Sequence, residues 1–252
     1  MKPAWLASRL VQLGFIGVIG LVWHAAVASG KISPLLLPPP ARVWSEFLSI
    51  VRTGEFWPDL KVTLYELAVA FLLAAIGGSA IGYVVSRWRY AIQVFDPLFA
   101  GLYAIPTILL IPLYILLFGL GPGSKIAMGT TIAFFPVVLN TIAGFSHVSE
   151  VYVTSARSMG ASARQMFWEV MVPAAFPIVL TGLRMGLILA FLAILGTETI
   201  ASISGLGHRI VDLAENMDTA RMLAYVIFVI LISLVLNTAV SWVEARGARR
   251  LA

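Results

Sequence analysis

Long apolar runs alternate with shorter polar segments along the chain. Each of six such runs reaches the roughly 20 residues that a helix needs to cross the hydrocarbon layer of a membrane. The predicted spans are residues 10–28, 63–86, 97–118, 126–145, 174–197 and 222–243. The pattern therefore predicts an all-α polytopic membrane protein in which residues 1–252 form a single transmembrane domain.

An amphipathic segment follows the first apolar run. Val43, Phe47, Ile50 and Val51 fall on one helical face, whereas polar side chains occupy the others. This pattern predicts a helix that lies on the outer surface of the membrane.

Composition agrees with a membrane location. Hydrophobic residues make up 60% of the chain and charged residues only 12%, which excludes an ordinary soluble domain. The net charge of +5 fits basic loops on the inner side of a membrane better than nucleic-acid binding. The chain has no cysteine, which excludes disulfides and cysteine-bound metals, and its three histidines are too scattered to form a metal site.

The first apolar run has two interpretations. Residues 26–28 read Ala-Val-Ala, which resembles a signal-peptidase site, but the run is longer than most signal peptides and five more spans follow. These features favour an uncleaved anchor. Six crossings place both termini on the same side, and the arginines of the tail assign that side to the cytoplasm.

The polar loop at residues 146–173, between the fourth and fifth spans, has a pattern of its own. Ala156, Ala163 and Phe167 recur at helical spacing, but Gly160 interrupts the pattern. A glycine can end a helix in the left-handed conformation, and the pair Ser162 and Gln165 has the form of a capping box, which starts a helix. The loop is therefore predicted to form a helix, a bend and a second helix.

The same loop resembles the cytoplasmic loop of permease subunits of binding-protein-dependent ABC importers. The pattern of that family is E-A-A, three residues, G, nine residues and I-x-L-P. Residues 154–156, Gly160, Val170 and residues 172–173 occupy these positions without a gap, although Thr154 replaces the acidic residue and Ser155 the first alanine. The stretches ISPLLLPPPARVW (32–44) and FGLG followed by SK (118–125) are also similar to such permeases, the first to those of the nitrate, sulfonate and taurine branch.

This resemblance implies a fold, partners and a function. It implies a type I importer permease in a bacterial inner membrane that carries a small anion or a sulfonate-like compound. The implied partners are two copies of an ATPase that binds ATP and Mg, a soluble solute-binding protein, and a second permease chain, expected to form a homodimer, although a heterodimer remains open. No cofactor in this chain and no nucleic-acid partner are expected. The residues implied to couple to the ATPase are Thr154, Ser155, Ala156, Arg157, Ser158, Met159, Gly160, Ala161, Ser162 and Ala163.

Polar side chains inside the predicted spans are candidates for the lining of a transport pathway. An arginine at the middle of a span costs about 2.5 to 3.5 kcal/mol, so Arg184 either meets an anionic substrate or lies as an anchor near the inner membrane edge. Asn140 is expected to form an interhelical hydrogen bond, with substrate contact as the alternative. The span at 97–118 contains two prolines, which predicts either a pathway wall or a kinked packing helix. The pathway candidates are Tyr103, Thr107, Tyr114, Asn140, Arg184 and Glu198.

No catalytic motif accompanies these spans. The stretch FGLGPGSK departs from the spacing of a phosphate-binding loop, and neither a nucleophile elbow nor clustered acids are present. A membrane enzyme is therefore disfavoured. A secondary transporter or channel, the other alternative, would need an internal repeat or several charges within the membrane. Small residues at four-residue intervals in the second span, Ala74, Gly78 and Gly82, and in the fifth span, Gly182 and Gly186, predict close helix packing.

Overall fold

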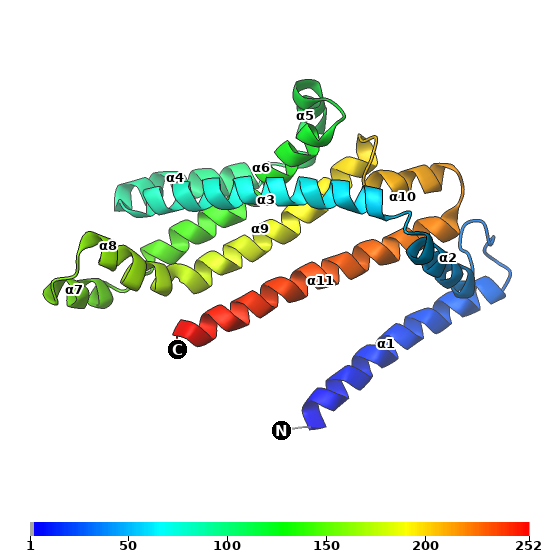
Figure 1. The fold of residues 1–252 in the computed structure, drawn as a ribbon, viewed down its shortest axis with the longest axis horizontal. Helices are drawn as coiled ribbons and strands as arrows, with labels where there is room; N and C mark the ends of the chain where they lie inside the picture. Colours follow the sequence, from blue (N-terminus) through cyan, green and yellow to red (C-terminus); the bar gives the residue numbers. More distant parts are fainter. Residues whose placement is uncertain (1–2, 252) are drawn as a thin grey trace. The chain divides into compact units, whose positions relative to one another are not determined.

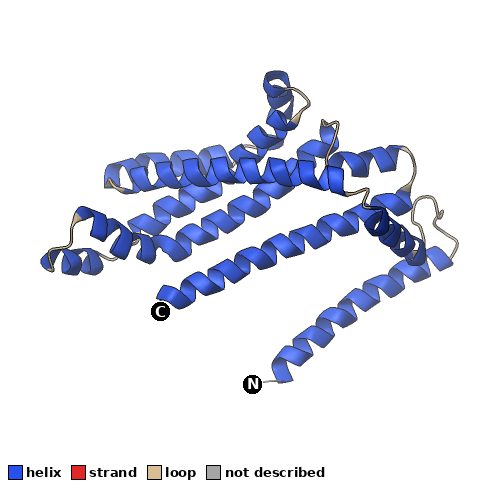
Figure 2. Ribbon diagram, viewed as in Figure 1, coloured by secondary structure: helices blue, strands red, loops and turns tan. Residues whose placement is uncertain are grey.

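The computed structural model describes residues 3–251, with side chains at residues 11–12, 14–15 and 17–242. This described part is helical throughout, with turns and short loops between the helices and no strand (Figure 2). The α-helices are α1 (Pro3–Ala28), α2 (Pro40–Thr53), α3 (Trp57–Ser86), α4 (Arg89–Tyr103), α5 (Ile111–Phe118), α6 (Pro122–Ser146), α7 (Glu150–Ser158), α8 (Ala163–Gln165), α9 (Val172–Ile200), α10 (Leu206–Glu215) and α11 (Thr219–Leu251). A 3-10 helix, η1 (Thr107–Leu110), precedes α5, and a π-helix, η2 (Met166–Met171), precedes α9.

Four helices of the described part are long and apolar enough to cross a membrane, or five if a bent pair counts as one span. The four helices and the bent pair together cover the second to sixth predicted spans. The first predicted span, 10–28, falls on α1, where some side chains lie outside the described residues and only Gly17–Ala28 is recognised as a shorter apolar helix. Six crossings therefore remain a prediction.

The chain divides into two compact units. The larger unit contains residues 59–208 and the chain from residue 231 onward, and the smaller unit contains the chain up to residue 58 together with residues 209–230.

Close packing of α3, α6 and α9 forms the core of the larger unit (Figure 1). A Cβ atom built on Gly82 of α3 would lie 2.6 Å from the Cβ of Thr141 on α6. Where α9 meets α6, a Cβ atom built on Gly186 of α9 would lie 2.8 Å from a methyl group of Val137 on α6. The predicted small-residue ridges are thus confirmed as the surfaces through which these helices approach one another.

The third predicted span is broken, as its prolines predict. Its helix begins at Arg89, earlier than the expected Pro97, and the segment bends by 76° between α4 and the pair formed by η1 and α5 (Figure 1). Proline disfavours helical geometry in the residue before it, so Pro106 accounts for a break at Ile105. Pro106 is one of the two prolines expected to interrupt the span at 97–118, and the structure breaks the helix there.

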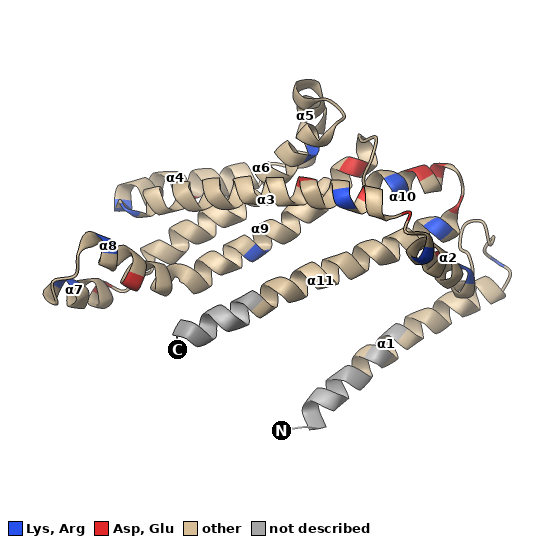
Figure 3. Ribbon diagram, in the orientation of Figure 1, with Lys and Arg blue, Asp and Glu red and all other residues tan. Residues whose placement is uncertain are grey.

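Charged residues of the larger unit gather at the two ends of its long helices (Figure 3). One end carries α7 and α8, and the other carries α5 and the turn before α10. Between them the helices are largely uncharged, as expected for a segment that lies in hydrocarbon.

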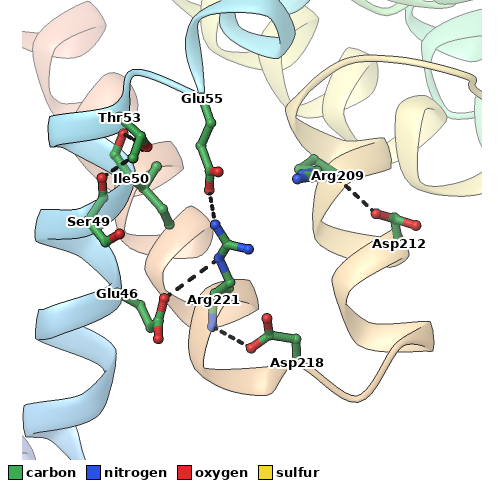
Figure 4. A network of polar contacts seen from close by, with 9 residues as sticks. All are labelled: Glu46, Ser49, Ile50, Thr53, Glu55, Arg209, Asp212, Asp218 and Arg221. Atoms are coloured by element: carbon green, nitrogen blue, oxygen red, sulfur yellow. Dashed lines mark hydrogen bonds and ion pairs between the residues drawn. The ribbon is translucent and has the colours of Figure 1, made fainter.

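In the smaller unit, an arginine and an aromatic cluster connect α11 to α2 and to the turn that follows α2. Arg221 of α11 contacts Glu55 at 2.6 Å and Glu46 of α2 at 3.6 Å (Figure 4). Beside this network, Phe228 packs against Phe47 and Phe56 with ring centroids 4.6 and 4.7 Å apart.

Helix α2 confirms the predicted amphipathic helix. Val43 and Ile50 are buried, as their shared face requires, but Val51 is 45% exposed and does not belong to the buried face. Trp44 and Trp57 are exposed. Such positions suit aromatic side chains at the level of lipid headgroups.

Candidate functional site

A bent helical segment joins α6 to α9, and we call residues 150–165 the elbow. Helix α7 ends in a Schellman motif, because the backbone N–H of Ala161 donates to Ala156 O at 3.1 Å and that of Gly160 to Arg157 O at 3.0 Å. Gly160 adopts a φ of 80°, in the left-handed region. The predicted helix end at Gly160 is therefore confirmed.

The second half of the elbow begins with a complete capping box. The Ser162 hydroxyl accepts from the Gln165 backbone N–H at 3.3 Å, and the Gln165 side chain accepts from the Ser162 N–H at 3.0 Å. This reciprocal pair starts α8 in a fixed direction. The predicted sequence of helix, bend and helix is what the chain forms.

The elbow presents most of its predicted coupling residues to the outside. Of the ten residues 154–163, only Ala156 is buried and Ala161 half-buried. Met159, which the apolar spacing places on the same face as Ala156, is instead 81% exposed. Tyr152, seven residues earlier and therefore on the same helical face as Met159, is 60% exposed. An exposed apolar face of this kind is typical of a surface that a partner covers.

The elbow continues into a membrane helix without a break. Residues 163–200 form one helix of 38 residues, and its junction with the elbow is the π-helix η2. A π-helical turn inside an α-helix is rare and often lies at a functional position. Any force on the elbow would therefore pass directly into α9.

Two pathway candidates of the broken span lie against α6. The Tyr114 hydroxyl and the Thr131 hydroxyl are 2.7 Å apart, and the Tyr103 ring packs against Phe135 with centroids 5.8 Å apart. Thr107 lies half-buried in η1, within the bend. A broken helix whose freed backbone groups face protein fits the wall of a solute pathway. It fits a kinked packing helix equally well.

Asn140 and Arg184 have separate partners. The Asn140 amide donates to Pro136 O, one turn earlier in its own helix, at 2.8 Å, so the expected interhelical bond is replaced by an intrahelical one. Gly182 of α9 packs closely here, since a Cβ atom on it would lie 2.5 Å from the Cβ of Asn140. Arg184 lies mid-helix and donates from Nη2 to Asn237 Oδ1 on α11 at 2.8 Å. An amide partner of this kind lowers the cost of the guanidinium inside a span.

Glu198 is the centre of a buried polar cluster at the α5 end of the larger unit. Its carboxylate accepts from the Thr63 hydroxyl and from the backbone N–H of Gly207, each at 2.7 Å. The Thr63 hydroxyl in turn accepts from the Leu206 N–H at 3.0 Å. The carboxylate thus ties α9, α3 and the turn before α10 together.

Two glycines of the turn at residues 204–207 lie too close to neighbouring atoms for a side chain. Gly205 has a φ of 105°, and a Cβ atom on it would overlap the Glu198 carboxylate. On Gly207, a Cβ atom would lie 2.6 Å from Leu195 O. Glycine at both positions therefore allows the backbone to reach the carboxylate.

Lys125 and Glu66 belong to the same cluster, and sequence reasoning missed their proximity. Lys125 and Glu66 are buried, and both interact electrostatically with Glu198. The Lys125 ammonium also donates to the carbonyls of Leu120 and Gly121. Glu66, Lys125 and Glu198 each lie at the same end of a predicted span. This shared depth in the membrane was the sequence feature that could have indicated their proximity. Thr63, Glu66, Lys125, Glu198 and residues 204–207 are called the Glu198 cluster below.

These features define a polytopic helical membrane protein with an exposed elbow rigidly continuous with one of its spans. No group of three or more metal-ligating side chains occurs in the part of the chain that the structure describes. Residues 74–251 match the family model of the binding-protein-dependent transport system inner membrane component, and the chain belongs to this family.

Individual relatives agree with the family assignment. The chain is 31% identical to the taurine transport system permease protein of Escherichia coli K12, over 98% of this chain and 92% of the relative. It is 29% identical to the nitrate import permease protein of Leptolyngbya laminosa, over 77% and 69% of the two chains. Among solved structures, a chain of the inward-facing MetNI methionine ABC transporter matches with a TM-score of 0.58 and 16% identity, over 79% of this chain and 98% of that chain. This last likeness supports the type I fold.

Proposed function

We propose that the chain is the membrane-spanning subunit of an ATP-driven importer that carries a small anion or a sulfonate-like compound. A soluble protein binds the solute outside the inner membrane, and the pathway forms between two copies of this chain with both termini in the cytoplasm. The match of residues 74–251 to the family carries the proposal, and the names of the taurine and nitrate relatives support the solute class.

Residues 154–163 of the elbow would dock in a groove on each of two ATPase subunits, which bind the ATP and Mg. The exposed face around Met159 and Tyr152 supports this role, because it leaves apolar area for a partner to bury. The unbroken helix from residue 163 to residue 200 would then carry ATPase movement into the bundle. Differential affinity of the ATPase for two bundle states would shift the population between inward-open and outward-open forms.

We predict that Gly160→Val strongly reduces copurification of the ATPase with this chain. A Cβ atom on Gly160 would meet nothing within 4 Å, so the conflict comes only from the left-handed backbone. That conformation costs about 1–2 kcal/mol for an ordinary residue and more for a β-branched one, which corresponds to binding weaker by about tenfold or more. The measurement is the amount of ATPase subunit retained on the affinity-tagged permease.

Gly160→Asn is the matched control for this variant, because asparagine tolerates the left-handed region. It should retain the ATPase at close to the level of the unchanged chain. Equal retention by the valine and asparagine variants would contradict a role for the bend in docking. Transport by the purified chain without nucleotide would instead favour a secondary transporter.

The pathway would run along α6 and α9, with Tyr103, Thr107, Tyr114, Asn140, Arg184 and Glu198 as its candidate polar residues. Arg184 has the sharpest test, because Asn237 provides a matched variant. Asn237→Leu removes one hydrogen-bond partner of Arg184 and keeps the charge, whereas Arg184→Gln removes the charge. If Arg184 attracts the anionic solute, Arg184→Gln is expected to lower solute uptake well below that of Asn237→Leu. Equal losses in uptake and in thermal stability would make Arg184 an anchor for α11.

The solute itself is best identified through the binding protein. A screen of sulfonates, nitrate and related anions by thermal shift of that partner should show stabilisation by one of these classes. Stabilisation only by neutral or cationic solutes would overturn the proposed solute class while leaving the transport role intact.

A further inference from the structure

A basic cavity lies between the elbow and the end of α3. It encloses about 540 Å³ and is lined by Tyr83, Ser86 and Arg87 from the α3 end, by Arg157 of α7, and by Met166 and Phe167 of η2, among others. The cavity thus brings two exposed arginines, far apart in sequence, to one partly open space.

The two arginines face this cavity without an acidic partner. No carboxylate lines it, and no salt bridge to Arg87 or Arg157 occurs among the described residues. The nearby acid Glu169 lines a different pocket, together with Arg164. Arg87 has only an aromatic neighbour, with its guanidinium carbon 6.0 Å from the centre of the Tyr83 ring. Two unneutralised guanidinium groups in one cavity favour an anion.

The floor of the cavity is apolar and aromatic. Tyr83 and Phe167 meet edge to face with centroids 4.9 Å apart, and Phe145 packs against both rings. Met166 is buried beneath them. The cavity therefore offers charge at its rim and apolar contact below, which suits a ligand with an anionic head and an apolar body.

The cavity also lies at the level of the membrane surface. The apolar helix α3 ends at Ser86, and the aromatic side chains that follow or flank the cavity, Trp88, Tyr90 and Trp168, are exposed. Tryptophan and tyrosine gather where hydrocarbon meets headgroups. Anionic lipids of the inner leaflet supply phosphates at this depth.

The cavity borders the exposed face proposed to meet the ATPase, and Arg157, Ala161 and Ala163 of the proposed docking segment line it. On α7, Val153 and Arg157 are four residues apart and both line the cavity, whereas Tyr152 and Met159 occupy another face and are exposed. A partner that covers only the face of Tyr152 and Met159 would leave the cavity face free.

We infer that this cavity binds the phosphate of an anionic phospholipid, with Arg87 and Arg157 as its ligands and the acyl chain over the aromatic floor. Such a lipid would bridge the end of α3 and the elbow, and would brace the elbow against the bundle. The inference rests on the proposed cytoplasmic side of the elbow, which places the cavity at the inner leaflet, and does not depend on which solute is carried.

The test compares lipid binding by the intact transporter in phosphatidylcholine nanodiscs with and without phosphatidylglycerol. Phosphatidylglycerol should raise the thermal unfolding midpoint, and native mass spectrometry should show it retained. Arg87→Gln should weaken this retention about tenfold, because a charge-assisted contact is lost, and should remove the rise in the midpoint. Arg157→Gln should act in the same direction.

Arg89→Gln is the matched control, since Arg89 is an exposed arginine two residues away that does not line the cavity. It should keep both the lipid retention and the midpoint shift. Equal behaviour of the Arg87 and Arg89 variants would overturn the site. Equal stabilisation by inorganic phosphate, added to transporter in phosphatidylcholine alone, would overturn the lipid in favour of a free anion. Loss of ATPase copurification in Arg87→Gln with unchanged lipid retention would assign the cavity to the ATPase interface and would also overturn the inference.

Discussion

Replacing Glu198 with leucine is expected to lower the stability of the transporter by several kcal/mol, because each buried donor left without an acceptor costs about 1 to 3 kcal/mol. Leucine is similar in size but accepts no hydrogen bond. The N–H of Gly207 and the hydroxyl of Thr63 would both lose their acceptor in the buried cluster. The thermal unfolding midpoint of the detergent-solubilised transporter should fall markedly, and protease cleavage within residues 201–207 should become faster.

Glu198→Gln should give an intermediate result. The amide oxygen can still accept from Gly207, and the amide nitrogen can donate to the Thr63 oxygen. The Thr63 oxygen would then accept from both the Leu206 N–H and the new amide. The Thr63 hydroxyl proton, in contrast, would lose its acceptor. The order of stability is therefore the unchanged chain, then glutamine, then leucine.

Glu215→Leu is the control for the loss of an acid from the same stretch of chain, since Glu215 is exposed at the end of α10. Its unfolding midpoint should change little. Equal midpoints for the Glu198 and Glu215 leucine variants would show that the cluster does not hold the fold. If Glu198→Leu also abolished solute uptake in such a case, Glu198 would be a pathway residue.

The elbow could be predicted from sequence because its determinants are local. A left-handed glycine and a capping box act within a few residues, so Gly160, Ser162 and Gln165 were sufficient to indicate the bend. The π-helical turn at residues 166–171 was missed. The apolar spacing does not distinguish a π-helical turn from an ordinary helix.

The Glu198 cluster was harder to predict because its members are distant in sequence. Thr63 and Glu198 are 135 residues apart, and only the packing of α3 against α9 brings them together. Sequence indicated the level of each charge in the membrane but not which faces of the helices meet. For the same reason the intrahelical bond of Asn140 and the contact between Arg184 and Asn237 were not foreseen.

The faces through which helices pack could be predicted where small residues mark them, as at Gly82 of α3. Gly82→Val is expected to prevent α3 from packing on α6. A Cβ atom at this position would lie 2.6 Å from the Cβ of Thr141 and 2.8 Å from the backbone oxygen of Val138. A backbone atom cannot turn away as a side chain can, so the helices must separate. Overpacking of a core costs about 1–3 kcal/mol and occasionally more, and valine adds two further methyl groups.

Gly77→Val separates this steric effect from the general cost of valine in a helix. Gly77 lies in α3 as well, but a Cβ atom built on it would meet nothing within 4 Å. We expect the Gly77 variant to be recovered as a monodisperse species with a near-normal unfolding midpoint, and the Gly82 variant to be recovered poorly or to unfold much earlier. Gly82→Ala should fall between them, because its single Cβ atom already meets Thr141 and Val138. If all three variants behaved alike, the close approach of α3 and α6 at Gly82 would not be what holds these two helices together, and the packing derived from the small-residue ridge would be wrong.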